Sequence, residues 1–133
     1  MTLIINSLDE ISHNYDALFV DLWGCVHNGI TAYASAVNAL VEYRKNGGKV
    51  VLVTNSPKPR IGVEKQLLNF NVPKICYDSV ATSGDSARTA MFMGAVGKKI
   101  YFIGEPRDQG FFEPISVIRS PIVIEKVSIQ NAE

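Results

Sequence analysis

The sequence has few cysteines, no excess of charge of either sign and no long apolar run. Its two cysteines, Cys25 and Cys76, are far apart and in no metal-binding spacing, which excludes a disulfide scaffold and predicts two reduced thiols. Thirteen Lys and Arg balance thirteen Asp and Glu, so no broad basic surface exists for nucleic acid or an anionic membrane. Apolar stretches such as 50–53 are far shorter than the roughly 20 residues of a membrane span, and residues 1–10 lack the pattern of a signal peptide. We therefore expect a cytoplasmic protein without nucleic-acid or membrane partners.

What the sequence does contain is enough apolar surface for one globular domain. Of its 133 residues 47% are apolar, and a single domain commonly has roughly 100–150 residues. Two apolar runs, 17–20 and 50–53, end in Asp21 and Thr54 and are typical of strands buried on both faces. Between them, apolar residues recur at helical spacing from residue 33 to a Gly-Gly stop at 47–48. Strands joined by a helix predict a parallel β-α-β unit, and hence an α/β fold with a doubly wound parallel sheet.

Further elements follow from capping residues and from shorter apolar patterns. Ser7 with Glu10 three residues later is a capping box, and Ser83 is expected to cap another helix. The expected elements are helices over 8–14, 60–69 and 83–93, a third strand over 99–103, and two C-terminal strands over 115–118 and 122–127.

Asp21 and Thr54 each close a predicted strand, and in a parallel sheet ligands bind beyond the carboxyl ends of the strands. Both side chains are therefore expected at the same edge of the sheet. A carboxylate at the tip of a buried strand costs desolvation free energy unless a cation or backbone N–H groups compensate it. From these residues alone, Asp21 is either a functional carboxylate or a local cap of the loop that follows the strand.

Several short motifs follow one another in a recognisable order. An apolar strand leads into Asp-Leu-Trp-Gly-Cys-Val-His-Asn-Gly at 21–29, and a second apolar strand leads into Thr-Asn-Ser at 54–56. This pattern resembles the first two motifs of the haloacid dehalogenase-like (HAD) superfamily, and the Thr-Asn pair is typical of its subfamily IIA, the nitrophenylphosphatase- and nucleotidase-like branch. The chain is similar to a group of that subfamily whose first motif reads Asp-x-Trp-Gly at three further places: from Tyr33 onward, at 82–85 and at 101–105.

The resemblance extends to roughly residue 113 and implies a Rossmann-like core that hydrolyses a small phosphorylated metabolite. Asp21 would attack phosphorus to form an aspartyl-phosphate, which water then hydrolyses. Thr54 would hydrogen-bond the phosphoryl group, and the backbone N–H groups of Leu22, Trp23 and Asn55 would stabilise its oxygens. The resemblance also implies Mg²⁺ as cofactor, held by Asp21 and by the main-chain carbonyl of Trp23.

The chain departs from the family pattern in two ways. The family's second Asp, the general acid and base two residues after the nucleophile, is replaced by Trp23, and His27 is a candidate substitute because imidazole titrates near neutral pH. The third-motif Lys, the fourth-motif Gly-Asp pair and the cap domain are not found in residues 1–133. We therefore interpret residues 1–133 as a partial, truncated core, its first half, predicted to be inactive alone. Its first strand would then be a sheet edge open to self-association.

Two other interpretations of these residues differ in what they require of the sequence. A non-catalytic phosphate-binding or interaction module of the same fold is the main alternative. A receiver domain also pairs an Asp with a Thr or Ser, but it needs an acidic pair after its first strand and its phospho-acceptor after the third. Here Asp21 is followed by Leu-Trp, and the strand over 99–103 leads into Gly-Glu, so a receiver is disfavoured. The identity of the substrate is not predicted, because it depends on the cap.

Overall fold

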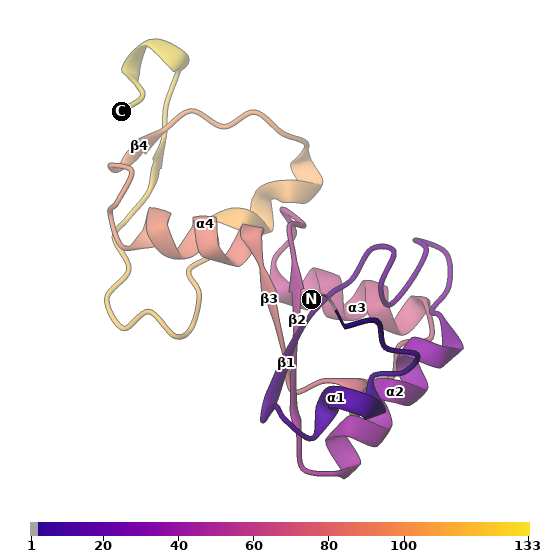
Figure 1. The fold of residues 1–133 in the computed structure, drawn as a ribbon. Helices are drawn as coiled ribbons and strands as arrows, with labels where there is room; N and C mark the ends of the chain where they lie inside the picture. Colours follow the sequence, from indigo (N-terminus) through magenta and orange to yellow (C-terminus); the bar gives the residue numbers. More distant parts are fainter. Residues whose placement is uncertain (1–2) are drawn as a thin grey trace. The chain divides into compact units, whose positions relative to one another are not determined.

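The computed structural model describes residues 3–133, which form two compact units (Figure 1). The first unit comprises the described residues up to Thr54 together with Arg60–Ala81, and the second comprises Asn55–Pro59 together with Thr82–Glu133. A three-stranded sheet organises the first unit, and a two-stranded sheet lies in the second. No helix within residues 3–133 is long and apolar enough to cross a membrane.

The first unit alternates strands with helices. Its strands form a sheet in the order β1-β2-β3, in which β1 runs parallel to β2. This arrangement confirms the predicted mixed α/β fold with a parallel sheet. In chain order the elements are α1 (Asp9–Ser12), β1 (Ala17–Asp21), α2 (Ala34–Lys45), β2 (Lys49–Thr54), α3 (Arg60–Asn69), η1 (Lys74–Cys76) and β3 (Ser79–Thr82).

The core of the first unit lies on one face of this sheet. Strand β2 contributes the fully buried Val50 and Leu52, and α3 contributes Val63 and Leu67. Their side chains are apolar, and removing them from water supplies the main stabilising free energy of the unit. The other members of the cluster come from the loops, from α2 and from the segment before and within β3: Leu22, Val26, Leu40, Tyr43, Val72, Cys76, Tyr77 and Val80.

The apolar run 17–20 predicted a strand buried on both faces, and this prediction is wrong for β1. Exposed and half-buried residues alternate along it, and the side chain of Phe19 is 78% exposed. On the neighbouring strand Val53, which is in register with Asp21, is also exposed. A continuous apolar run is compatible with burial on one face or on two, because sidedness depends on what packs against the strand and not on the strand itself.

Most helix boundaries of the first unit match the sequence. Helix α3 spans the predicted 60–69, and α2 ends before Gly47, whose φ of 91° is the left-handed conformation of a helix stop. Helix α1 is shorter than predicted. Half of its predicted capping box is present, because the Glu10 carboxylate accepts a hydrogen bond from the Ser7 N–H at 3.2 Å.

The second unit is built around α4 (Ser83–Phe92). Its N-cap is Thr82 and not the predicted Ser83, because the Thr82 Oγ1 accepts a hydrogen bond from the Asp85 N–H at 2.9 Å. The two hydroxyl residues are adjacent in the chain, and Thr82 has the extended backbone conformation that a cap needs, whereas Ser83 is already helical. The other elements of the unit are β4 (Lys99–Ile100), η2 (Pro106–Phe112), β5 (Glu125–Lys126) and η3 (Ile129–Asn131).

The strands after α4 differ from those predicted. The expected third strand over 99–103 is reduced to the two residues of β4, which pair with β5 in a separate parallel ladder. Residues 115–118 form a turn, and the run over 122–127 contains only the short β5. The third strand of the main sheet is instead β3, which the prediction missed. With Val80 as its one large apolar residue, β3 has too weak a pattern to be recognised before its pairing partner is known.

Candidate active site

Asp21 and Thr54 lie at the same edge of the sheet. Asp21 is the last residue of β1 and Thr54 the last residue of β2, and these strands are parallel neighbours. The register aligns Asp21 with Val53, so Thr54 lies one residue further along. Asp21 is exposed and Thr54 is half-buried. The edge therefore presents an accessible carboxylate next to the end of a strand that closes with a hydroxyl group.

The chain turns back on itself directly after Asp21. The buried Leu22 directs its carbonyl at three backbone N–H groups, those of Cys25, Val26 and His27, at 3.3, 2.9 and 3.2 Å. The Gly24 N–H donates to the His27 carbonyl at 2.9 Å, and Gly24 has a φ of 78° that suits glycine. These bonds do not involve the N–H or the carbonyl of Trp23. Within residues 3–133, the bonds that close this turn therefore leave these two main-chain groups unused.

The Trp23 side chain is held in place although it is 69% exposed. Its indole meets the His27 ring edge-on, with ring centroids 6.0 Å apart and planes at 89°. Gly29 lies against the same indole so closely that a Cβ at this position would stand 2.3 Å from Trp23 Cζ3. Packing on two residues of its own loop thus fixes an exposed aromatic surface two residues after Asp21.

His27 is folded back into the first unit, as a role near Asp21 requires. It is buried, and its Nδ1 accepts a hydrogen bond from the Gly29 N–H at 3.0 Å. On its other side the Phe70 ring lies 4.8 Å away between centroids. Burial lowers the pKa of His27, and the Asp21 carboxylate raises it to a smaller extent. The imidazole is therefore neutral at pH 7, with its proton on Nε2 because Nδ1 is an acceptor.

Comparison with known proteins identifies the family to which the segment with this loop belongs. A model of the family described as haloacid dehalogenase-like hydrolase matches residues 18–115, which include β1 from its second residue, all of β2 and the turn after Asp21. The chain belongs to the haloacid dehalogenase-like hydrolase family. No curated protein matched the chain.

A solved structure supports the same assignment. The chain is similar to a haloacid dehalogenase-like hydrolase from Brucella suis 1330, with 36% sequence identity and a TM-score of 0.82. The similarity covers 98% of this chain and 46% of that one, so the chain spans less than half the length of its structural neighbour. Both the fold and the hydrolase family are therefore established.

The other residues predicted to bind phosphate or Mg²⁺ belong to different parts of the structure. Leu22 and Trp23 follow Asp21 directly, whereas the exposed Asn55 follows Thr54 and is the first residue of the second unit. Haloacid dehalogenase-like hydrolases generally use Mg²⁺. Within residues 3–133 no group of three His, Cys, Asp or Glu side chains could hold a metal ion. The exposed Asp21 carboxylate and the Trp23 carbonyl are nevertheless oxygen donors, the hard ligands that Mg²⁺ accepts when waters and substrate complete its shell.

Sequence reasoning missed two residues that shape this loop, Gly29 and Phe70. Gly29 packs under Trp23, and Phe70 touches His27 while its carbonyl accepts a hydrogen bond from the Ala32 N–H at 2.8 Å. A glycine eight residues after the candidate nucleophile was the one available signal. Phe70 gave none, because its contact joins residues far apart in the chain.

Proposed function

We propose that the protein acts on a small phosphorylated metabolite by phosphoryl transfer to Asp21. The observation that carries this proposal is the exposed Asp21 carboxylate at the carboxyl end of β1, beside the end of β2 and before a tight turn. The family membership supports hydrolytic chemistry, and ligands of open α/β sheets bind at this edge. We place the protein in the cytoplasm, which agrees with its two unpaired cysteines.

The proposed reaction has two displacements at phosphorus. An Asp21 carboxylate oxygen forms a bond to phosphorus while the ester oxygen leaves and takes a proton from solvent; water then cleaves the aspartyl-phosphate to release phosphate. Thr54 would donate its hydroxyl hydrogen to a phosphoryl oxygen, and the backbone N–H groups of Leu22 and Trp23 would donate to the others. Mg²⁺, when bound by Asp21 and the Trp23 carbonyl, supplies positive charge against the phosphoryl oxygens.

The proposed reaction needs a general acid and base, and neither Trp23 nor His27 is well suited to that role. Trp23 stands where the family has its second Asp, and an indole has no group that titrates near neutral pH and could act as general acid or base. The neutral His27 is buried and its Nδ1 is already an acceptor. Trp23 at this position supports the assignment to the Asp-x-Trp-Gly group of subfamily IIA. The features of Trp23 and His27 together favour low intrinsic turnover. They also support the alternative, a non-catalytic module that binds phosphate through the same carboxyl-edge loop.

The aspartyl-phosphate mimic beryllofluoride tests the role of Asp21. Together with Mg²⁺ it should bind the chain and change the fluorescence of Trp23, the single tryptophan. Asp21→Asn removes the carboxylate oxygen to which beryllium binds and should abolish the change. Asp16→Asn, which alters another exposed carboxylate immediately before β1, should leave it intact. Equal binding by the Asp21→Asn variant would remove the basis of the proposal.

Turnover separates the enzyme from the non-catalytic module. We predict that the 133-residue chain does not detectably hydrolyse nitrophenyl phosphate, even with excess Mg²⁺. A dianionic phosphoryl group repels the Asp21 carboxylate, and each missing charge-stabilising group costs roughly 2.7–4 kcal/mol of transition-state stabilisation. The measurement is nitrophenolate release, with the Asp21→Asn variant as blank. Mg²⁺-dependent release that disappears in this variant would mean that residues of this chain replace the missing motifs.

A further inference from the structure

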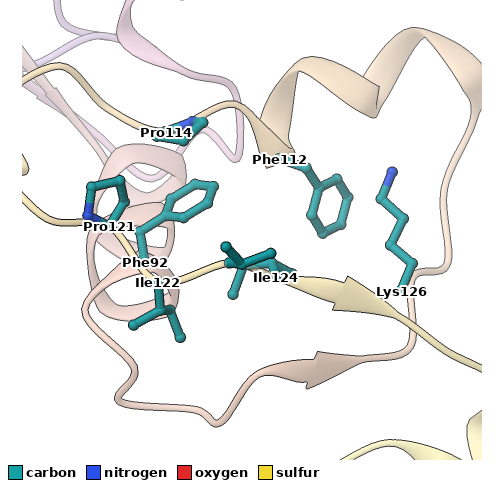
Figure 2. A pocket seen from close by; sticks show the side chains of 8 residues that line it. Phe92, Phe112, Pro114, Pro121, Ile122, Ile124 and Lys126 are labelled. Carbon is teal, nitrogen blue, oxygen red and sulfur yellow. The ribbon is translucent and has the colours of Figure 1, made fainter.

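The second unit contains an apolar pocket that the proposed chemistry does not use. Its volume is about 290 Å³, and it lies between α4, η2 and the segment that runs into β5 (Figure 2). Phe92, Phe112, Ile122 and Ile124 line it, and Lys126 is the only charged residue among its lining side chains. The volume is at the lower end of the roughly 300–1,000 Å³ of small-molecule sites.

Hydrogen bonds fix all three walls of this pocket. The Arg88 guanidinium on α4 donates to the carbonyls of Phe111 and Glu113, and so holds the end of η2. The Ile122 N–H donates to the Phe92 carbonyl at 2.9 Å, which ties the third wall to the end of α4. The ladder between β4 and β5 holds the far end of that wall. A site built on such a frame needs little ordering to bind a ligand, which favours affinity.

The ammonium group of Lys126 has neutral partners. Its Nζ lies 4.2 Å from the centroid of the Phe112 ring and 5.6 Å from that of Phe102, and it donates to the Gln109 Oε1. Figure 2 shows the Lys126 side chain beside Phe112, next to the apolar lining. Rings and an amide attract the cation but leave its charge uncompensated. Within residues 3–133 no salt bridge to Lys126 is formed.

We propose that this pocket binds a small monocarboxylate with an apolar body, such as a medium-chain fatty acid. The apolar body would fill the space between Phe92, Phe112 and Ile124, and the carboxylate would pair with Lys126. A single flexible ammonium suits one carboxylate, whereas phosphate groups are commonly held by several N–H donors or by the paired donors of arginine. All contributing residues belong to the second unit, so the proposal is independent of the chemistry assigned to Asp21.

Octanoate and octan-1-ol, two ligands with the same chain length, provide the test. We would titrate each into the 133-residue chain and follow the NMR signals of Ile122 and Ile124. Octanoate should cause saturable shifts with about two- to fivefold higher affinity than octanol, the range expected for an ion pair at an exposed lysine. Lys126→Gln should reduce octanoate affinity to that of octanol, and Lys126→Arg should retain it. Lys98→Gln, on an exposed lysine outside the lining, is the matched control.

Four results would overturn the proposal. Equal affinity for octanoate and octanol, or an unchanged octanoate affinity in Lys126→Gln, would show that the charge plays no part. Absence of saturable shifts up to the solubility limit of octanoate would show that the pocket does not bind such a ligand. Shifts of the same signals on raising the protein concentration without ligand would mean that a second copy of the chain covers the pocket.

Discussion

Gly29 and Trp23 pack so closely that no side chain larger than hydrogen fits between them. We predict that Gly29→Ala destabilises the first unit by roughly 2–3 kcal/mol, because it adds a clash with the indole to the strain of a φ of 88°. The single tryptophan should then lose its fixed contact, so its fluorescence spectrum should shift toward that of a fully solvated indole. Urea denaturation and emission spectra measure the two effects.

Gly24→Ala provides the matched control for this substitution. Gly24 has a similar positive φ of 78°, but a Cβ there would meet nothing within 4 Å. It should therefore cost only about 1 kcal/mol and leave the Trp23 spectrum unchanged. If the two alanine variants lose the same stability and give the same spectrum, the contact between Gly29 and Trp23 does not hold the indole.

Asp78 connects helix α2 with strand β2. Its carboxylate accepts hydrogen bonds from the Val50 N–H at 2.8 Å and from the Arg44 Nε and Nη2 at 3.1 and 2.9 Å. The bond from Val50, followed by that from Arg44, lowers the pKa of Asp78 below its ordinary value of 3.8. The folded state thus favours the ionised form. The resulting stability is present above pH 3.8 and is lost as the pH falls through the lower folded pKa.

We therefore predict that Asp78→Asn removes an acid-dependent part of the stability. The difference in the free energy of unfolding between the native chain and Asp78→Asn should be largest above about pH 4 and should shrink as the pH falls below 3.8. Denaturation at a series of pH values measures it. Asp16→Asn serves as control. A difference that stays constant down to the acid limit would contradict the assigned role of the ionised Asp78.

In the second unit, Arg88 connects helix α4 with η2. Its side chain is 10% exposed and donates to the carbonyls of Phe111 and Glu113 and to Asp85. We predict that Arg88→Met loosens η2 by roughly 2–4 kcal/mol, because Asp85 loses its ion pair with Arg88 and the carbonyls of Phe111 and Glu113 lose the guanidinium donor. Amide hydrogen exchange across 106–113 measures this local opening.

Arg107→Met is the comparison for Arg88→Met. The Arg107 side chain is 78% exposed, and its ion pair with Glu105 is 3.0 Å long. Exposed pairs contribute little, so exchange across η2 should change by less than about 1 kcal/mol. Similar exchange rates in both variants would show that η2 does not depend on the buried guanidinium.

The three-stranded sheet leaves β1 at its edge, with the apolar Phe19 exposed on it. Unpaired edge strands with apolar side chains favour association between copies. We predict concentration-dependent sedimentation of the chain, reduced by Phe19→Lys because an edge lysine opposes strand pairing. Ile61→Lys changes an equally exposed residue on α3 and should leave association unchanged. A monomer at all concentrations, or equal effects of the two lysine variants, would contradict association through β1.

Much of the first unit could be predicted from local pattern. The bounds of α3, the stop of α2 at Gly47 and the placement of Asp21 and Thr54 at strand ends all follow from periodicity and from residues that cannot continue an element. Such signals act over a few neighbouring residues, so they are readable in the chain. The family motifs depend on the same short segments, which is why the fold class and the hydrolase family agree with the comparison.

What could not be predicted depends on residues far apart in the chain. β3 becomes a strand because β2 lies beside it, and β4 and β5 are joined across 25 residues, Lys99 to Glu125 in the register. The exposure of Phe19 is set by what covers each face of the sheet, which periodicity does not contain. The indole of Trp23 gains its support from Gly29 and His27, and the pocket beside Lys126 forms where three segments meet. The sequence by itself therefore determined which segments form helices and where the candidate nucleophile lies, because these depend on local stereochemistry. Only the tertiary structure decided burial, strand partners and pockets, because these depend on contacts between segments that are distant in the chain.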